Sequence, residues 1–122
     1  MSPADGGAVA TVALFNAAFD RRDLDAVMAL MSQDCVFDGT SPPDGERFTG
    51  QDAVAGAFRA VFDGARSGTF TTEEIFAAGD RVVARWRYDW VDHAGGAGHV
   101  RGVDLFTVAD GRVVEKLSYV KG

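Results

Sequence analysis

The sequence predicts an α+β domain in which three helices come first and antiparallel strands follow. Apolar residues recur at helical spacing through residues 9–65, and beyond Gly68 the spacing falls to two, which is the period of a strand. Turn-forming residues at 78–80 and 109–111 divide the second half into hairpins. A run of helices followed by a run of antiparallel strands is typical of an α+β fold.

The predicted helices are set by their apolar stripes and by one capping residue. The first spans about residues 9–19, and the second spans residues 24–31 behind Asp23, whose side chain suits an N-cap. The third spans about residues 51–65, with a stripe of Val and Phe on one face. A brief extended segment at residues 35–38 and a loop rich in Gly, Ser and Pro separate the second helix from the third.

The predicted strands alternate between two faces and are joined by turns. They lie at about residues 69–77, 81–91, 99–108 and 112–120. Ala109-Asp110-Gly111 is a strong hairpin signal, and the glycine-rich stretch 92–98 predicts a longer, flexible connection. A strongly curved antiparallel sheet around the helices would enclose a pocket.

Length and charge limit what the protein can be. We expect a single domain over residues 1–122, of which residues 1–7 are disordered. The net charge of −6 argues against nucleic acid and membranes as partners, because both favour basic surfaces. The one cysteine, Cys35, excludes an internal disulfide, and the sequence shows neither a secretory signal nor an apolar run of membrane-spanning length. We therefore expect a cytoplasmic protein.

Asp104 is the most informative residue of the sequence. Gly102, Asp104, Phe106 and Val108 alternate onto one face of a predicted strand, so this carboxyl group has apolar neighbours. Burying a charged carboxylate is costly, so Asp104 should either have a partner or have a raised pKa, which would suit a proton donor. The alternative is a structural Asp that pairs with an Arg or caps a backbone group.

Several stretches of the sequence resemble a known family. Residues 21–31, 34–38 and 48–54 are similar to the opening of a SnoaL-like polyketide cyclase domain, and residues 101–120 are similar to its end. This family is part of the nuclear transport factor 2-like superfamily, which also holds ketosteroid isomerase and limonene epoxide hydrolase. The resemblance implies a cone-shaped α+β barrel, in which three N-terminal helices pack in a strongly curved antiparallel sheet around a hydrophobic pocket.

Ketosteroid isomerase provides one comparison for the catalytic residues. Asp104 falls where the isomerase keeps a protonated Asp that binds an oxyanion. Phe15 stands in the place of its Tyr, and Gly39 stands in the place of its base carboxylate. Asp38 is one residue away and could serve only with a different strand register.

Epoxide hydrolase provides a second comparison. Arg87-Tyr88-Asp89 has the form of its Arg-x-Asp pair, whereas Ser118 stands where the last strand should carry a second Asp. Strand alternation puts Trp86 and Tyr88 on one face and Arg87 and Asp89 on the other. If the aromatic face lines the cavity, the charged pair points outward, so epoxide hydrolysis is the less favoured function.

SnoaL-like cyclases use an acidic residue as general acid–base in an aldol closure. The resemblance therefore implies a cyclase, isomerase or lyase that needs neither cofactor nor metal, with Asp104 as acid–base and Asp38 or a His as a secondary donor. The pocket is expected to bind a small apolar or polycyclic ligand. The residues expected to contact this ligand are Phe15, Phe19, Trp86, Tyr88, Trp90, His99, Phe106 and Ser118.

A second class of function stays open, which is a non-catalytic ligand-binding or dimeric assembly module of the same fold. An unpaired Asp104 would favour the enzyme, and an Asp104 held by a cation would favour the module. Lys116 is expected to be a solvated charge, although strand parity puts it on the same face as Ser118. We expect no metal, because the two histidines lack the spacing of metal ligands.

The resemblance also implies a homodimer formed through the outer face of the sheet. That face would carry Arg85, Arg87 and Asp89 among β-branched residues. Such a surface could pair with its own copy.

Overall fold

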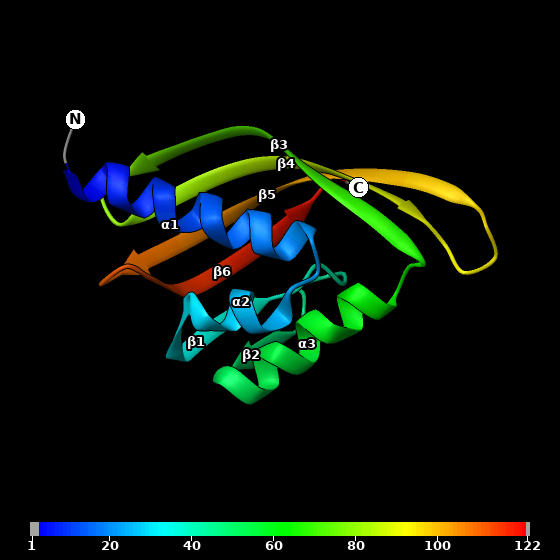
Figure 1. Ribbon diagram of the computed structural model, residues 1–122, viewed down its shortest axis with the longest axis horizontal. Helices are drawn as coiled ribbons and strands as arrows, with labels where there is room; N and C mark the ends of the chain where they lie inside the picture. Colours follow the sequence, from blue (N-terminus) through cyan, green and yellow to red (C-terminus); the bar gives the residue numbers. More distant parts are fainter. Residues whose placement is uncertain (1–2, 122) are drawn as a thin grey trace.

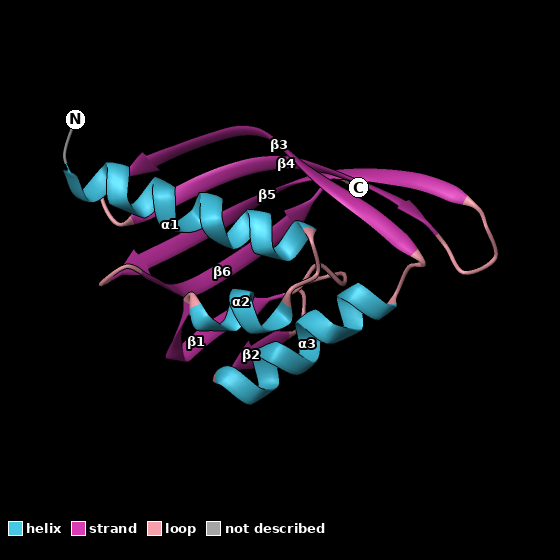
Figure 2. Cartoon of the chain, in the orientation of Figure 1, coloured by secondary structure: helices cyan, strands magenta, loops and turns pink. Residues whose placement is uncertain are grey.

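The computed structural model describes residues 3–121, which form three helices and a curved, six-stranded sheet that does not close (Figure 1). The elements in chain order are α1 (Pro3–Asp20), α2 (Leu24–Ala29), β1 (Met31–Asp38), β2 (Arg47–Thr49), α3 (Gln51–Asp63), β3 (Ser67–Ala78), β4 (Arg81–Val91), β5 (Ala97–Ala109) and β6 (Arg112–Val120). The helices lie on one side of the sheet (Figure 2). The predicted α+β fold is therefore confirmed.

The N-terminal half follows its local signals closely. Helix α2 begins as predicted, because the Asp23 carboxylate accepts a hydrogen bond from the Ala26 N–H at 3.1 Å. It ends earlier than predicted, at Ala29, because Met31 already pairs with Val113 as part of β1. The disorder predicted for residues 1–7 falls in part outside the described residues, and the backbone is helical from Pro3.

The sheet is larger than predicted and has the order β2-β1-β6-β5-β4-β3. The brief extended segment predicted at residues 35–38 is the end of the eight-residue strand β1, which pairs in parallel with β6. The short strand β2 was not predicted and pairs antiparallel with β1. The four predicted strands form the antiparallel meander β3–β6, as expected from their turns.

The predicted hairpin turn between β5 and β6 is confirmed by its backbone. Asp110 and Gly111 have φ values of 53° and 73°, the left-handed conformation that suits a tight hairpin. Irregular pairing between Thr72 and Glu74 in β3 marks a bulge, which bends the strand. Bulges of this kind help the sheet to curve toward the helices.

The core lies between the helices and the inner face of the sheet. Phe15 of α1, Phe58 of α3 and Phe106 of β5 are fully buried. The ring of Phe15 meets those of Phe58 and Phe106 edge-on, with centroids 6.1 and 5.5 Å apart. These three rings thus join α1, α3 and β5 in one aromatic cluster.

Candidate functional site

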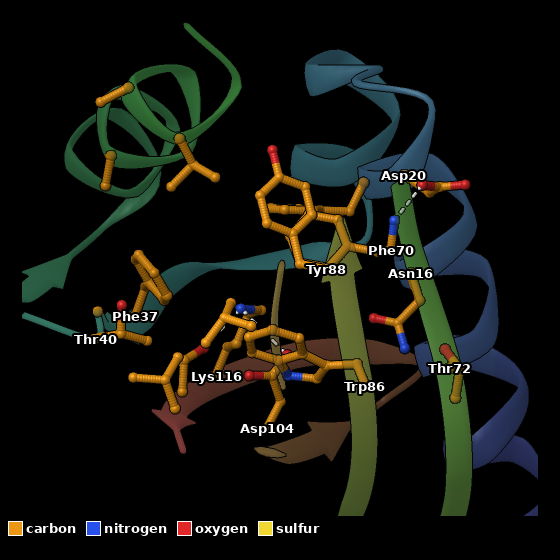
Figure 3. Close-up of a pocket in the computed structure, with 18 of the residues that line it drawn as sticks. Asn16, Asp20, Phe37, Thr40, Phe70, Thr72, Trp86, Tyr88, Asp104 and Lys116 are labelled. Atoms are coloured by element: carbon orange, nitrogen blue, oxygen red, sulfur yellow. Dashed lines mark hydrogen bonds and ion pairs between the residues drawn. The ribbon is translucent and has the colours of Figure 1, made fainter. Parts of the chain in front are cut away.

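A pocket of about 740 Å³ lies between α1, α3 and the inner face of strands β3–β6. Its lining is mainly aromatic and aliphatic, with a few polar side chains (Figure 3). This size and composition are typical of a small-molecule site.

One wall of the pocket is a ladder of aromatic rings. Phe70 of β3 stacks on Tyr88 of β4 at 4.2 Å and meets Trp86 edge-on at 5.6 Å. Phe19 of α1 joins the ladder through Phe70 at 5.3 Å. The ladder offers a flat apolar surface of the kind that binds fused rings.

Glycines let these rings lie close to the neighbouring strands. The ring of Tyr88 lies where a side chain on Gly68 would be, and the indole of Trp86 lies where one on Gly102 would be. Any larger residue at either glycine would push the ring into the pocket. The backbone of β3 and β5 thus fixes the shape of the aromatic wall.

The polar floor of the pocket consists of Asp104, Lys116 and Ser118. Pairing of β5 with β6 sets Asp104 opposite Ser118 and Phe106 opposite Lys116, so all three polar side chains reach the inner face. The Lys116 ammonium donates to the Ser118 hydroxyl at 2.8 Å and lies 3.4 Å from Oδ2 of Asp104. The Asp104 and Lys116 side chains are only 8% and 9% exposed, so this ion pair is buried.

Aromatic rings surround the cation of this pair. The Lys116 nitrogen lies 4.8 Å from the ring centroid of Phe37, 5.4 Å from that of Phe19 and 5.8 Å from that of Phe58. Rings within about 6 Å attract an ammonium group through their negative faces. Lys116 is therefore held in place as a cation by its contacts with Asp104, Ser118 and these rings.

Two buried polar atoms at the pocket have no hydrogen-bond partner among the described residues. One is Oδ1 of Asp104, an acceptor, and the other is Nε1 of Trp86, a donor. Both side chains line the pocket, as Figure 3 shows. Buried polar groups normally have partners, so these two atoms are unsatisfied polar groups of residues that line the pocket.

The rim of the pocket carries further polar groups. Asp20, at the end of α1, accepts a hydrogen bond from the Phe70 N–H at 2.7 Å and ties α1 to β3. Asn16 and Thr72 lie on the same side (Figure 3), and Glu46 lines the pocket from the loop before β2. Asp20 is thus a structural tie at the rim.

Five of the residues predicted for the site line the pocket. They are Phe19, Trp86, Tyr88, Asp104 and Ser118. Of the two fates predicted for Asp104, the structure shows the partnered one, with Lys116 as the partner.

Four predicted ligand contacts lie elsewhere. Phe15 and Phe106 have the expected orientation but are fully buried in the core behind the pocket. Trp90 lies beyond the pocket, over Gly98 at the end of the hairpin, where it lines a separate small groove. His99 is opposite Asp89 on the outer face, because only the even-numbered residues of β5 point inward.

Asp38 does not join Asp104. Its carboxylate accepts two hydrogen bonds from Arg47, at 2.8 and 3.0 Å, outside the pocket lining. Strand alternation turns Phe37 inward instead, and Gly39 lines the pocket. The register that would have brought Asp38 inward is not the one observed.

The charged pair on β4 points outward, as strand alternation predicts. The Arg87 guanidinium donates to the Asp89 carboxylate at 2.9 Å, and this hydrogen bond lowers the pKa of Asp89 below its ordinary value of 3.8. Neither residue is among those that line the pocket. The pocket thus lacks the Arg-x-Asp pair of an epoxide hydrolase, and Ser118 stands where the second acid would be.

Lys116 is the main residue that sequence reasoning misplaced. A lone lysine in an alternating strand is usually solvated, yet this side chain is buried against Asp104. The sequence did contain one indication of this position. Lys116 is two residues from Ser118, and residues two apart on a strand point to the same face. The described residues include no cluster of His, Cys, Asp or Glu that could hold a metal ion.

Comparison with known proteins agrees with this architecture. The model of the SnoaL-like domain family matches residues 12–116. A solved NTF2-like protein of unknown function from Mesorhizobium loti is 36% identical, with a TM-score of 0.83 over 100% of this chain and 97% of that one. No curated protein matches the chain by sequence.

Two further solved structures share the fold. A candidate polyketide cyclase from Xanthomonas campestris pv. campestris is 25% identical, with a TM-score of 0.80 over 96% of this chain and 92% of that one. An LEH-like epoxide hydrolase from M. tuberculosis is 22% identical, with a TM-score of 0.82 over 98% of this chain and 86% of that one. None of the described helices has both the length and the apolar character that crossing a membrane requires.

Proposed function

Since the chain belongs to the SnoaL-like domain family of the nuclear transport factor 2-like superfamily, we propose that it binds a small apolar or polycyclic molecule and transfers a proton on it. The reaction is of the cyclase, isomerase or lyase type and needs no cofactor, with Asp104 as the acid–base. The observation that carries the proposal is the free Oδ1 of a buried Asp104 at the pocket floor.

The ion pair determines how Asp104 would act. Lys116 lies 3.4 Å from Oδ2, and Oδ1 has no hydrogen-bond partner among the described residues, so we assign Oδ1 as the atom that accepts the proton. In a ring closure, Oδ1 takes a proton from a carbon next to a carbonyl group, and the resulting carbanion attacks a second carbonyl carbon of the same molecule, whose C=O double bond opens to an alkoxide. The same proton then passes to the alkoxide oxygen. In an isomerisation it returns to another carbon, so neither reaction has a net change in protons.

Asp38 has no part in this proposal, because Arg47 binds it outside the pocket. Phe19, Trp86 and Tyr88 instead form the apolar wall against which a ring system would lie.

The test is proton exchange on a bicyclic ketone, 2-tetralone, in D₂O. The wild-type protein is expected to speed the loss of the α-proton signal in the NMR spectrum. Asp104→Asn should slow this exchange by about a hundredfold or more, since general acid–base groups contribute factors of that order. Asp89→Asn, on the outer face of β4, is the matched control and should exchange as the wild type does. Equal rates for Asp104→Asn and wild type would contradict the proposal.

A non-catalytic ligand-binding module is the second candidate. The observation that favours it is the buried ion pair with Lys116, because the sequence predicts an Asp104 held by a cation for such a module. In that case the protein binds the ketone but leaves its exchange rate unchanged, which the same spectra would show.

We also propose a homodimer formed through the outer face of the sheet. Strand pairing aligns an apolar row across it, made of Phe76, Val83, Leu105 and Leu117. Phe76 is 49% exposed. Ion pairs of Arg85 with Glu73 and Glu74 flank the row, and a face with both charges can pair with its own copy.

Sedimentation at several concentrations tests the dimer. Leu105→Glu should give a monomer, whereas Leu14→Glu, on the exposed face of α1, should leave the dimer intact. A wild-type protein that stays monomeric at high concentration would contradict this part of the proposal.

A further inference from the structure

The three aromatic residues on the inner face of β4 share one feature. The ring of each covers a glycine on a neighbouring strand, in the space that a side chain there would fill. Trp86 covers Gly102, Tyr88 covers Gly68, and Trp90 covers Gly98. A glycine allows such close approach because it has no Cβ, so the position of each ring depends on the residue beneath it.

Gly68 is the glycine whose effect is confined to the pocket. The three nearest atoms to a Cβ at this position all belong to the side chain of Tyr88, which lines the pocket. A Cβ on Gly102 would also meet the backbone carbonyl of Tyr119, so a change there disturbs the sheet itself. Trp90, the third ring, lies outside the pocket lining.

The neighbours of Tyr88 limit where its ring could move. The ring stacks on Phe70 of β3, with centroids 4.2 Å apart, and on Trp90 of its own strand at 5.8 Å (Figure 3 shows Phe70 beside it). A Cβ on Gly68 would lie 2.6 Å from Cζ of the ring, whereas carbon atoms pack at about 3.5–4.0 Å. Because the stacked rings restrict sideways movement, the ring would be displaced by about 1 Å away from the sheet, into the pocket.

The helix side of the pocket offers no room for this displacement. Much of its lining there is already alanine, namely Ala13 and Ala17 of α1 and Ala57 and Ala60 of α3. Their methyl groups sit on helical backbone and cannot turn aside, so the flat position of Tyr88 sets the width of the space between the layers. The volume of about 740 Å³ therefore depends on the absence of a side chain at Gly68.

We propose that Gly68 is a specificity-determining residue, which lets the ring of Tyr88 lie flat on the sheet and so opens the pocket to a flat apolar ligand of about four fused rings. A molecule of two rings can bind without reaching Tyr88, whereas a molecule of four rings extends past it. This inference rests on the proposed apolar-ligand pocket and names the size class of its ligand.

Fluorescence titration of the wild-type protein with pyrene and naphthalene is the first test. Pyrene has four fused rings and naphthalene has two, and neither carries a polar group. We expect pyrene to bind about tenfold or more tightly, because the larger molecule buries more apolar surface. This comparison needs no variant, so it does not depend on a substitution being tolerated.

A pair of glycine variants tests the role of Gly68. Gly68→Ala should weaken pyrene binding by about tenfold, the scale expected when one extra methyl group is forced into a packed site, and should change naphthalene binding by less than about twofold. Gly98→Ala is the matched control, because it places the same methyl group beneath the indole of Trp90, outside the pocket lining. It should bind both probes as the wild type does.

A double-variant cycle tests whether Gly68 acts through Tyr88. In the Tyr88→Ala background no ring is left to displace, so adding Gly68→Ala should change pyrene affinity by less than about twofold. An equal effect of Gly68→Ala with and without the ring would overturn the role given to this pair, as would equal weakening by Gly68→Ala and Gly98→Ala.

The outcomes separate this inference from the function on which it rests. A wild-type protein that binds naphthalene but binds pyrene no more tightly would overturn the size class and leave the apolar pocket standing. Failure of both probes to bind would overturn the proposed ligand-binding function and the inference with it.

Discussion

Replacing Lys116 by Met should destabilise the protein by about 3–5 kcal/mol, because it leaves Asp104 as a buried charge without a partner. The Nζ–Oδ2 distance of 3.4 Å corresponds to an attraction of about 5 kcal/mol at an effective dielectric constant of about 20. Both side chains are less than a tenth exposed, so solvent screens the pair little. Urea unfolding followed by tryptophan fluorescence, at one fixed protein concentration, measures the loss.

Two controls make this prediction specific. Lys121→Met removes an exposed lysine at the end of β6 and should change stability by less than about 0.5 kcal/mol. The double variant Asp104→Asn/Lys116→Met should lose clearly less than the sum of its two single variants, since each single change strands the other charge. Additive losses, or a loss below about 1 kcal/mol for Lys116→Met, would refute the reasoning.

Three further outcomes follow from the contacts. Gly102→Ala should lower the free energy of unfolding in urea by about 1–3 kcal/mol, because the new Cβ would overlap the neighbouring backbone and the indole ring of Trp86. Gly56→Ala is the control, because Gly56 lies on the exposed face of α3 with free space around it, and this change should raise the free energy of unfolding by about 0.5–1 kcal/mol. Carboxyl NMR should show that the lowered pKa of Asp89 rises toward 3.8 in Arg87→Ala. The Arg87–Asp89 pair stabilises the fold above about pH 4, and this stabilisation is lost as the pH falls through the lowered pKa of Asp89. Burial raises the pKa of the Cys35 thiol, so it should react with Ellman's reagent at pH 8 only after unfolding, and fast reaction of the native protein would contradict this.

Local pattern was enough to predict most of the fold. The alternation of β4 and β5 put Trp86, Tyr88 and Asp104 on the faces expected to line the cavity but left their parity open by one residue, and all three line the pocket. The parallel pairing of β1 with β6 could not be predicted, because it joins segments about 80 residues apart and leaves no local signal. The three-residue strand β2 pairs only with β1, so it could not be predicted without β1.

The site was harder to predict than the fold. Strand alternation predicts which face a side chain is on, but it does not predict whether that side chain reaches the pocket or packs in the core. Parity gave the same face to Trp86 and Trp90, yet only Trp86 reaches the pocket. Phe15 and Phe106 likewise point inward, but they are fully buried in the core and do not line the pocket. The partner of Asp104 was missed for a related reason, since Lys116 lies on another strand and only the β5–β6 register brings the two together.

The buried ion pair is better explained by the pocket than by the fold. An apolar pair of similar volume is often as stabilising as a buried salt bridge, so stability alone does not account for Asp104 and Lys116. An apolar pair could not provide a carboxylate at this position. In the ion pair, Lys116 contacts Oδ2 of Asp104, and Oδ1 has no hydrogen-bond partner among the described residues. Lys116 has its other contacts with Ser118 and three phenyl rings, so the carboxylate keeps one orientation when the pocket is empty. A group fixed in this way is preorganised for a ligand, because binding then needs little further ordering of the site.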